Sequence, residues 1–502
     1  MRDILSSAYS PLFQIVVSLN IENSGLSHLI SGTYNDMTSS IAKQPLITNK
    51  HEGINHSAAD AVFRLCELLE HTVFEPHVVS RLECPLPRIS LLTWLQSNKG
   101  HTKHFWTNRE KDFSIAGIGS ACTLSASSRD DIPAIFNHMS AYVAGSNATF
   151  VGGIAFDEQS VTEQWQQHPY AEFVLPQVEV SFKNGDYFLA VNGLPESKEA
   201  NSLLRRTLIN SLKALSFSNS HSDSGLSQTR VISQVHSPNN SVWNERVSNI
   251  LEDIASKEVK KVVLSRQTTL QLSQPIPGEA LLNEWRQLEH CGYLFLLKSG
   301  PHSFIGNSPE CLYKKEGNIL YTEALAGTVP RGCNHQEDIT YQKILRNDPK
   351  ILNEHQLVAE YILTQISHLS EVEDLNPPVS IVKLANIQHL CASFNAVLNE
   401  QITDAEIVQH LHPTPAVCGT PRNKATTRIH QLTDHARGWY SGIVGVVSEH
   451  HSEFCVAIRS ALINQDTLHC YAGVGLVNGS EAQAEWQELD AKIKTVLQLF
   501  NR

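Results

Sequence analysis

The chain has 502 residues, of which 41% are apolar and 18% are charged, a balance typical of soluble globular proteins. Asp and Glu outnumber Lys and Arg by 51 to 39, giving a net charge of -12, which argues against a nucleic acid partner because phosphate binding favours a basic surface. No apolar run approaches the roughly 18 residues that span a bilayer, and the 10 Cys include no C-x-x-C pair, so we expect a cytoplasmic protein with reduced thiols.

The N-terminal part of the chain shows ordinary signals of helix and strand. Apolar side chains at helical spacing predict a helix from about Ala58. Strands are predicted at 151–156 and 172–180, and Pro176 should interrupt the second because proline cannot donate a backbone hydrogen bond. A Ser-rich stretch at 216–227 is typical of an exposed loop.

Motifs become dense after this loop. Ser241 is a suitable N-cap for a helix, and β-branched residues predict a strand at 259–270. Alternation along that strand places Lys261 on the same face as Val263 and Ser265. A lysine at the start of a strand is most simply a solvated edge charge, so the position alone does not indicate a site.

Two glutamates follow turn or cap signals. Glu310 comes directly after Pro309, at a turn, where functional carboxylates are common. An acidic residue without a function would show the same pattern. Asp348 and Pro349 are typical of the N-cap and first position of a helix, which would carry Glu354 in its second turn. Taken alone, Glu354 is a charge on a helix face.

The C-terminal helix, predicted at 481–500, has an apolar stripe beside a charged one. Helical geometry brings Glu481, Glu485, Glu488 and Lys492 together on one face. A solvated, salt-bridged face is the simpler interpretation. The alternative is half of an oxygen-ligand site for a hard cation such as Mg²⁺.

A glycine-rich segment precedes this helix. Gly473, Gly475 and Gly479 miss the dinucleotide-binding spacing by one residue, and no second strand with an acidic end follows, so we exclude a Rossmann site. Small residues here would still let the backbone approach a ligand carboxylate closely.

The order of the motifs resembles the chorismate-utilising enzyme family, which includes anthranilate synthase large chains, aminodeoxychorismate synthases, isochorismate synthases and salicylate synthases. Over residues 241–500 the resemblance rests on KVVLSR, GNSPE, TEALAGTVPRG, IQHL, LHPTPAVCGTP, RGWYSGIVG, VAIRSAL and YAGVGLVNGSEAQAEWQELDAKI. The N-terminal segments PLPRISLLTWL, HFWTNRE and GGIAFD are similar to isochorismate synthases of the menaquinone branch.

This resemblance implies an α+β fold of the aminodeoxychorismate synthase type. It is a single large unit of two packed β-sheets flanked by helices, with the active site in the cleft between them. We divide the chain into a poorly specified and potentially mobile segment at 1–55, an N-terminal part at 56–230 and a catalytic, chorismate-binding part at 231–502.

One position bears on the subfamily. Aminodeoxychorismate synthases resemble this chain but carry a nucleophilic lysine where Ala326 stands here. A methyl group cannot attack C2 of chorismate, so water must be the nucleophile. The segment from His412 to Ala416 is similar to that of isochorismate and salicylate synthases, and the TEALAGTVPRG motif favours isochorismate formation. A salicylate synthase, which adds pyruvate elimination, and a non-catalytic chorismate-binding protein stay as alternatives.

The resemblance also implies roles for individual residues. Lys261 would activate the attacking water, and Glu310 would protonate the departing C4 hydroxyl. Mg²⁺ would be held by Glu354 and Glu488, with Glu485 as an adjacent helper.

The remaining residues implied by the resemblance bind the substrate, a dicarboxylate that needs local positive charge. They are Thr328, His389, Tyr440, Arg459, Gly473, Gly475 and Lys492. The expected partner is chorismate alone, without nucleic acid or membrane. We expect a monomer or weak dimer whose product feeds menaquinone biosynthesis.

Overall fold

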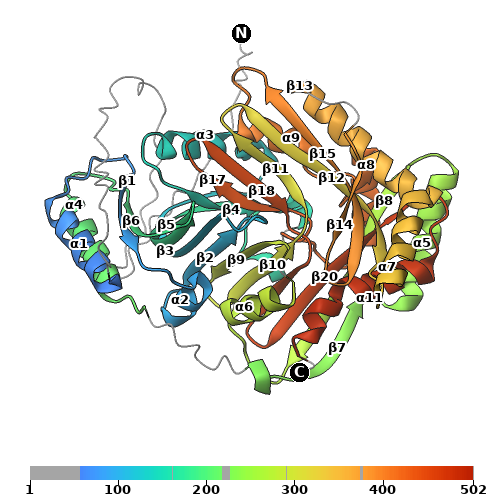
Figure 1. Cartoon of the computed structure of the whole chain (residues 1–502), viewed down its shortest axis with the longest axis horizontal. Coiled ribbons are helices and arrows are strands. Elements are labelled where there is room, and N and C mark those ends of the chain that lie inside the picture. The colour runs from blue at the N-terminus through green and yellow to red at the C-terminus, as the bar shows by residue number, and fades with distance from the viewer. Residues whose placement is uncertain (1–56, 161, 218–225, 290, 373–376, 501–502) are drawn as a thin grey trace, which may run out of the picture.

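The computed structural model (Figure 1) describes residues 57–160, 162–217, 226–289, 291–372 and 377–500. The segment predicted to be poorly specified, 1–55, lies outside these ranges, as does most of the predicted Ser-rich loop. Within the described ranges, no helix is long and apolar enough to cross a membrane. All 10 cysteines are free thiols, as expected, although Cys291 and Cys333 are exposed rather than buried.

Helices and strands are mixed along the described chain. The helices are α1 (Ala58–His71), α2 (Leu91–Ser97), α3 (Ile132–Val143), α4 (Asn201–Lys213), α5 (Asn240–Ala255), α6 (Gly278–Leu288), α7 (His335–Asn347), α8 (Pro349–Ser367), α9 (Asp404–Leu411), α10 (Arg422–Leu432) and α11 (Ala482–Gln498). The strands are β1 (Ser80–Leu86), β2 (Thr102–Thr107), β3 (Phe113–Ala126), β4 (Phe150–Ile154), β5 (Ala171–Lys183), β6 (Asp186–Gly193), β7 (Val231–Ser237), β8 (Lys261–Leu272), β9 (Tyr293–Ser299), β10 (His302–Ser308), β11 (Cys311–Glu316), β12 (Ile319–Pro330), β13 (Ser370–Val372), β14 (Ser380–Lys383), β15 (Ile387–Leu398), β16 (Gly419–Thr420), β17 (Ile443–Val447), β18 (His451–Val456), β19 (Ser460–Asn464) and β20 (Thr467–Leu476).

These strands form one continuous antiparallel network that forks at β5. One edge of β5 pairs with β3 along its length, while the other edge pairs first with β4 and then with β6. The first branch runs from β3 through β2, β9, β10, β19 and β20 to β8. The second runs from β4 through β17, β18, β11 and β12 to β15. The two expected sheets are therefore two branches of one network.

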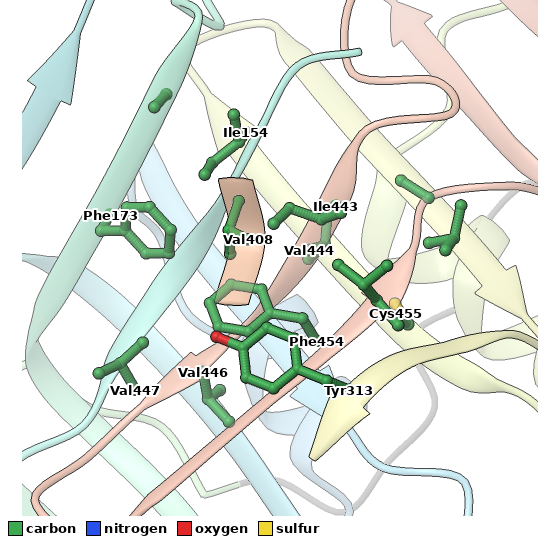
Figure 2. Packing of buried hydrophobic residues seen from close by; sticks show 14 of the residues in the cluster. Ile154, Phe173, Tyr313, Val408, Ile443, Val444, Val446, Val447, Phe454 and Cys455 are labelled. Atoms are coloured by element: carbon green, nitrogen blue, oxygen red, sulfur yellow. The ribbon is translucent and has the colours of Figure 1, made fainter. Parts of the chain in front are cut away.

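A hydrophobic core joins the two branches. It includes Phe295 and Phe304 from the first branch and Ile443 and Phe454 from the second. Figure 2 shows Phe454 beside Tyr313, with ring centroids 5.2 Å apart. Burying an aromatic side chain of this size contributes roughly 1.5–3 kcal/mol, so this shared core is a strong reason for the branches to pack together.

A second core lies between the first branch and the helices that cover it. Trp94 of α2, Leu281 of α6 and Leu489 of α11 pack there with Val262 and Leu270 of β8. In Figure 1, α1 and α4 lie together at one end of the molecule, and α5, α7 and α11 lie at the other. The predicted amphipathic helices bury their apolar faces in this way, as their spacing indicates.

The structure corrects two local predictions. Strand β5 continues through Pro176 on the edge that pairs with β3, where the register shifts between Ser120 and Cys122. On its other edge, pairing stops after Val174 and resumes at Val178, so Pro176 interrupts that edge alone. Helix α5 begins one residue before the predicted Ser241 cap, and its N-cap is Asn239, whose side chain accepts a hydrogen bond from the backbone N–H of Val242.

The two helices that carry predicted site residues begin as the sequence indicates. Asp348 caps α8 by accepting hydrogen bonds from the backbone N–H groups of Lys350 and Ile351. Helix α11 starts after Glu481 and buries Leu489, Ile493 and Val496. It also buries Glu485, which a solvated charged face would leave exposed.

Candidate active site

A cavity lies where strands of both branches meet α8 and α11. Strands β8 and β20 contribute from the first branch, and β12 and β15 contribute from the second. Most of the predicted site residues line it: Lys261, Glu310, Thr328, Glu354, His389, Tyr440, Arg459, Gly473, Gly475 and Lys492. Glu485 and Glu488 stand outside the lining. The structure thus brings together residues that are spread over more than 200 positions of the chain.

Lys261, at the first position of β8, is buried rather than a solvated edge charge. Its Nζ donates a hydrogen bond to Oε1 of Glu354 on α8 at 3.0 Å. Gly475 on the neighbouring strand β20 makes this approach possible, because a Cβ there would lie 2.4 Å from Cε of Lys261 and 2.6 Å from Oε1 of Glu354. The glycine therefore leaves room for an ion pair.

Glu354 is held in its charged form by the lysines around it. Burial alone raises the pKa of this carboxyl group, but the positive charges of Lys261, Lys492 and Lys350 outweigh burial and bring the pKa below its ordinary value. A half-buried carboxylate that stays ionised is a candidate metal ligand.

Glu310 has the opposite environment. It lies between β10 and β11, is almost completely buried, and faces the same cavity. Burial and the negative charge of Glu323 raise its pKa to about 8, although Lys261 and Lys492 act in the other direction. At neutral pH Glu310 therefore holds a proton that it can donate.

Two cations at the cavity are fixed by acidic neighbours. Lys492 on α11 pairs with Glu488 at 2.7 Å and donates to the backbone carbonyl of Gly473 at 2.8 Å. Arg459, which has a positive φ of 47°, donates to Glu289 at 3.0 Å. Sequence reasoning missed Glu289, since no motif links it to Arg459 across 170 positions.

An aromatic pair forms one wall. The rings of Tyr440 and Tyr471 stack with centroids 5.2 Å apart and an interplanar angle of 16°. Gln164 donates to the hydroxyl of Tyr471 at 2.8 Å. A Cβ at Gly473 would lie 2.7 Å from the hydroxyl of Tyr440. Tyr471 was not predicted as a site residue, although it begins the YAGVG motif.

His389 on β15 faces Thr328 on β12, with their Nδ1 and Oγ1 atoms 3.1 Å apart. Burial, aided by the charges of Arg459 and Lys492, brings the pKa of His389 well below its ordinary value. The ring is therefore neutral at pH 7 and offers a hydrogen bond rather than a charge.

The three predicted metal ligands share a set of lysines. Glu354 pairs with Lys261, Glu488 with Lys492, and Glu485 with Lys350 at 2.6 Å. The negative charges of Glu354 and Glu488 also act on Lys350, so the three carboxylates lie near one another. Within the described ranges, no three acidic, His or Cys side chains are close enough together to form a ready metal cage.

A family model described as "Chorismate binding enzyme" matches residues 67–501. The isochorismate synthase MenF of Haemophilus influenzae is 30% identical to the chain over 421 residues, which cover 84% of this chain and 91% of that protein.

Solved structures agree with this match. The menaquinone-specific isochorismate synthase MenF from Escherichia coli has a TM-score of 0.78 and 26% identity, covering 89% of this chain and 100% of that chain. Anthranilate synthase component I from Streptococcus pneumoniae shares the fold, with a TM-score of 0.62 and 19% identity over 85% of this chain and 94% of that chain.

Proposed function

The chain belongs to the chorismate-binding enzyme family, and we propose that it is an isochorismate synthase, an isomerase that converts chorismate to isochorismate. The observation that carries the proposal is that a buried lysine, Lys261, and a protonated carboxylic acid, Glu310, line one cavity. At the position where aminodeoxychorismate synthases carry a nucleophilic lysine, this cavity is lined by Ala326. Because the similar Escherichia coli enzyme is called menaquinone-specific, we propose the same destination for the product.

In this mechanism Lys261 acts at C2 of chorismate, and Glu310 acts at the C4 hydroxyl. Lys261 removes a proton from water as the water oxygen bonds to C2 of chorismate, and both ring double bonds shift, from C1–C2 to C1–C6 and from C5–C6 to C4–C5. The C4–O bond breaks, and Glu310 gives its proton to the departing hydroxyl, which leaves as water. The atoms of substrate and product balance, since one water enters and one leaves.

Lys261 accepts a proton only after it has released its own. In this structure its ammonium group pairs with Glu354 at 3.0 Å. The proposal therefore requires Glu354 to turn away from Lys261 when the site is filled.

The acidic side chains near α11 suit a hard cation. Glu354 and Glu488 would hold Mg²⁺, with Glu485 beside them, since Mg²⁺ takes oxygen ligands and commonly needs only one or two protein carboxylates. When bound, the ion would neutralise substrate carboxylate charge. The donor chemistry fits, because all three groups offer the hard carboxylate oxygens that Mg²⁺ prefers. Each carboxylate pairs with a lysine in this structure, and the ion would compete with that lysine for the same oxygens.

The other lining residues would bind and orient the substrate. Arg459 and Lys492 supply positive charge for the two carboxylates of chorismate. Tyr440, His389 and Thr328 offer uncharged hydrogen-bonding groups for its hydroxyl and ether oxygens. Gly473 and Gly475 act by leaving space.

The proposal is tested by incubating the protein with chorismate and Mg²⁺ and separating the products by chromatography. We expect isochorismate as the product. Release of salicylate and pyruvate without any added lyase would favour the salicylate synthase alternative, and unchanged chorismate would favour a non-catalytic binding protein.

A further inference from the structure

Arg109, in the N-terminal part of the chain, reaches the segment that carries Glu310. Its guanidinium donates two hydrogen bonds to the carboxylate of Glu323 on β12, at 2.8 and 2.9 Å. It also donates to the backbone carbonyl of Pro309 at 3.0 Å. A planar guanidinium that binds a carboxylate in this two-point manner has little freedom to move.

Glu323 completes the arrangement from the other side. Its Oε1 accepts a hydrogen bond from the backbone N–H of Cys311 at 2.9 Å, and its Oε2 accepts from the hydroxyl of Tyr321 at 3.1 Å. Pro309 and Cys311 are the two neighbours of Glu310 in the chain. Both neighbours are therefore hydrogen-bonded to the same ion pair, and Glu310 lies between these two hydrogen bonds.

The burial of this pair makes stability alone a weak explanation for it. The side chain of Glu323 is 1% exposed and that of Arg109 is 20% exposed. Removing two charges from water carries a desolvation cost that their attraction often fails to repay. The negative charge beside Glu310 also has a chemical effect, because it opposes ionisation of that acid.

We propose that Arg109 and Glu323 are positioning residues that hold Glu310 in place as the proton donor to the departing hydroxyl. This inference rests on the proposed function, in which Glu310 is that donor. It assigns a role to the N-terminal HFWTNRE motif, which contains Arg109 and which the mechanism otherwise leaves without one.

The charged and titratable groups that face Glu310 come from several elements. They are Glu323 on β12, Lys261 on β8, Lys492 on α11, Tyr440, and Cys455 on β18. Of the acids among them, Glu323 is the one that opposes ionisation of Glu310 most strongly. The rate should fall as the pH rises through the pKa of Glu310, since a proton donor must be protonated.

The test is the pH profile of kcat in the full chain carrying Glu323→Gln. Glutamine keeps an oxygen that accepts from Cys311 but removes the charge, and it leaves Arg109 positive. Both changes favour ionised Glu310, so the alkaline fall in rate should move about one unit to lower pH.

A matched control is Glu179→Gln, which alters a comparable buried pair away from the cavity. Glu179 contacts Arg81 at 2.6 Å, with side chains 1% and 6% exposed. Both variants should lower Tm, but Glu179→Gln should leave the pH profile unchanged. An alkaline fall at the same pH in Glu323→Gln and in the wild type would overturn the proposal.

Arg109→Lys provides a second, independent measurement. It keeps the charge that balances Glu323 but loses the two-point geometry, so kcat should fall about tenfold while KM changes little. A wild-type kcat in this variant would contradict the positioning role. Failure of the proposed function would appear differently, as absence of isochorismate in the wild type or as full activity in Glu310→Gln.

Discussion

At the scale of single residues, the site places two carboxyl groups, buried Glu310 and half-buried Glu354, in different protonation states. Glu354 faces lysines and is ionised, whereas Glu310 lies beside Glu323 and has a pKa of about 8. When their environments separate the pKa values of two carboxyl groups in this way, one can be a proton donor and the other an anion at the same pH. These environments support the proposed roles, in which Glu310 donates a proton and Glu354 binds the cation.

The acid and base roles predict large losses on substitution. Lys261→Ala and Glu310→Gln should each lower kcat by about 10²–10⁴-fold, because each removes a proton-transfer group. Circular dichroism and Tm should show that both variants stay folded. A double variant with a near wild-type rate would refute the assignment.

The acidic face of α11 predicts a metal effect. Glu488→Ala should raise the Mg²⁺ concentration needed for half-maximal activity about tenfold or more, because one of the two proposed carboxylate ligands is lost. Titration calorimetry with Mg²⁺ and substrate should show the same weakening. Gln487→Ala on the same helix is the control, and identical titration curves for both variants would count against the role of Glu488.

At the scale of elements, the site depends on where its strands and helices begin. Strand β8 begins at Lys261, and helix α8 places Glu354 in the second turn after its Asp348 cap. The cap and the strand were predictable, because both are local patterns. The burial of Lys261 was not, because it depends on the pairing of β8 with β20, whose residues lie some 200 positions away.

Gly475 on β20 gives a prediction for that pairing. A methyl group in Gly475→Ala would meet both Lys261 and Glu354, so their ion pair must shift, and kcat should fall about tenfold or more. Gly473→Ala would instead displace Tyr440, and should raise KM more than it lowers kcat. Steady-state kinetics on the two variants separate these effects, and an unchanged kcat in Gly475→Ala would contradict the packing argument.

At the scale of the whole molecule, both parts of the chain build the same network. Strand β2 pairs with β9, and β4 pairs with β17. The family fold was predictable from the order of the motifs, but contacts such as Arg109 with Glu323, 214 positions apart, were not. Such pairs leave no periodic signal, because nothing local distinguishes a buried ion pair from two surface charges.

Five buried or half-buried histidines make the whole fold sensitive to acid. Burial lowers the pKa of each of them, to about 3 or 4: His104, His168, His412, His435 and His469. They are uncharged when folded but gain protons when unfolded below pH about 6.5, so stability falls as the pH decreases through that value. Glu172 and Glu310, with pKa raised to about 7 and about 8, act in the opposite direction but are fewer.

We therefore expect Tm to drop by several degrees between about pH 7 and about pH 5, since each fully buried histidine costs up to about 1.4 kcal/mol per pH unit. Thermal unfolding at a series of pH values measures this. His450→Gln is the control, because that side chain is 84% exposed and its loss should leave the slope unchanged. A Tm that stays constant or rises over this range would contradict the prediction.

The most direct test of the central claim asks where the new hydroxyl group comes from. The reaction should be run with chorismate in water enriched in oxygen-18, and the isochorismate should be analysed by mass spectrometry. Activation of solvent by Lys261 predicts that the C2 hydroxyl carries the heavy isotope in the same fraction of product molecules as the water does. Isochorismate without the label would mean that the C4 oxygen migrates, and would contradict the mechanism.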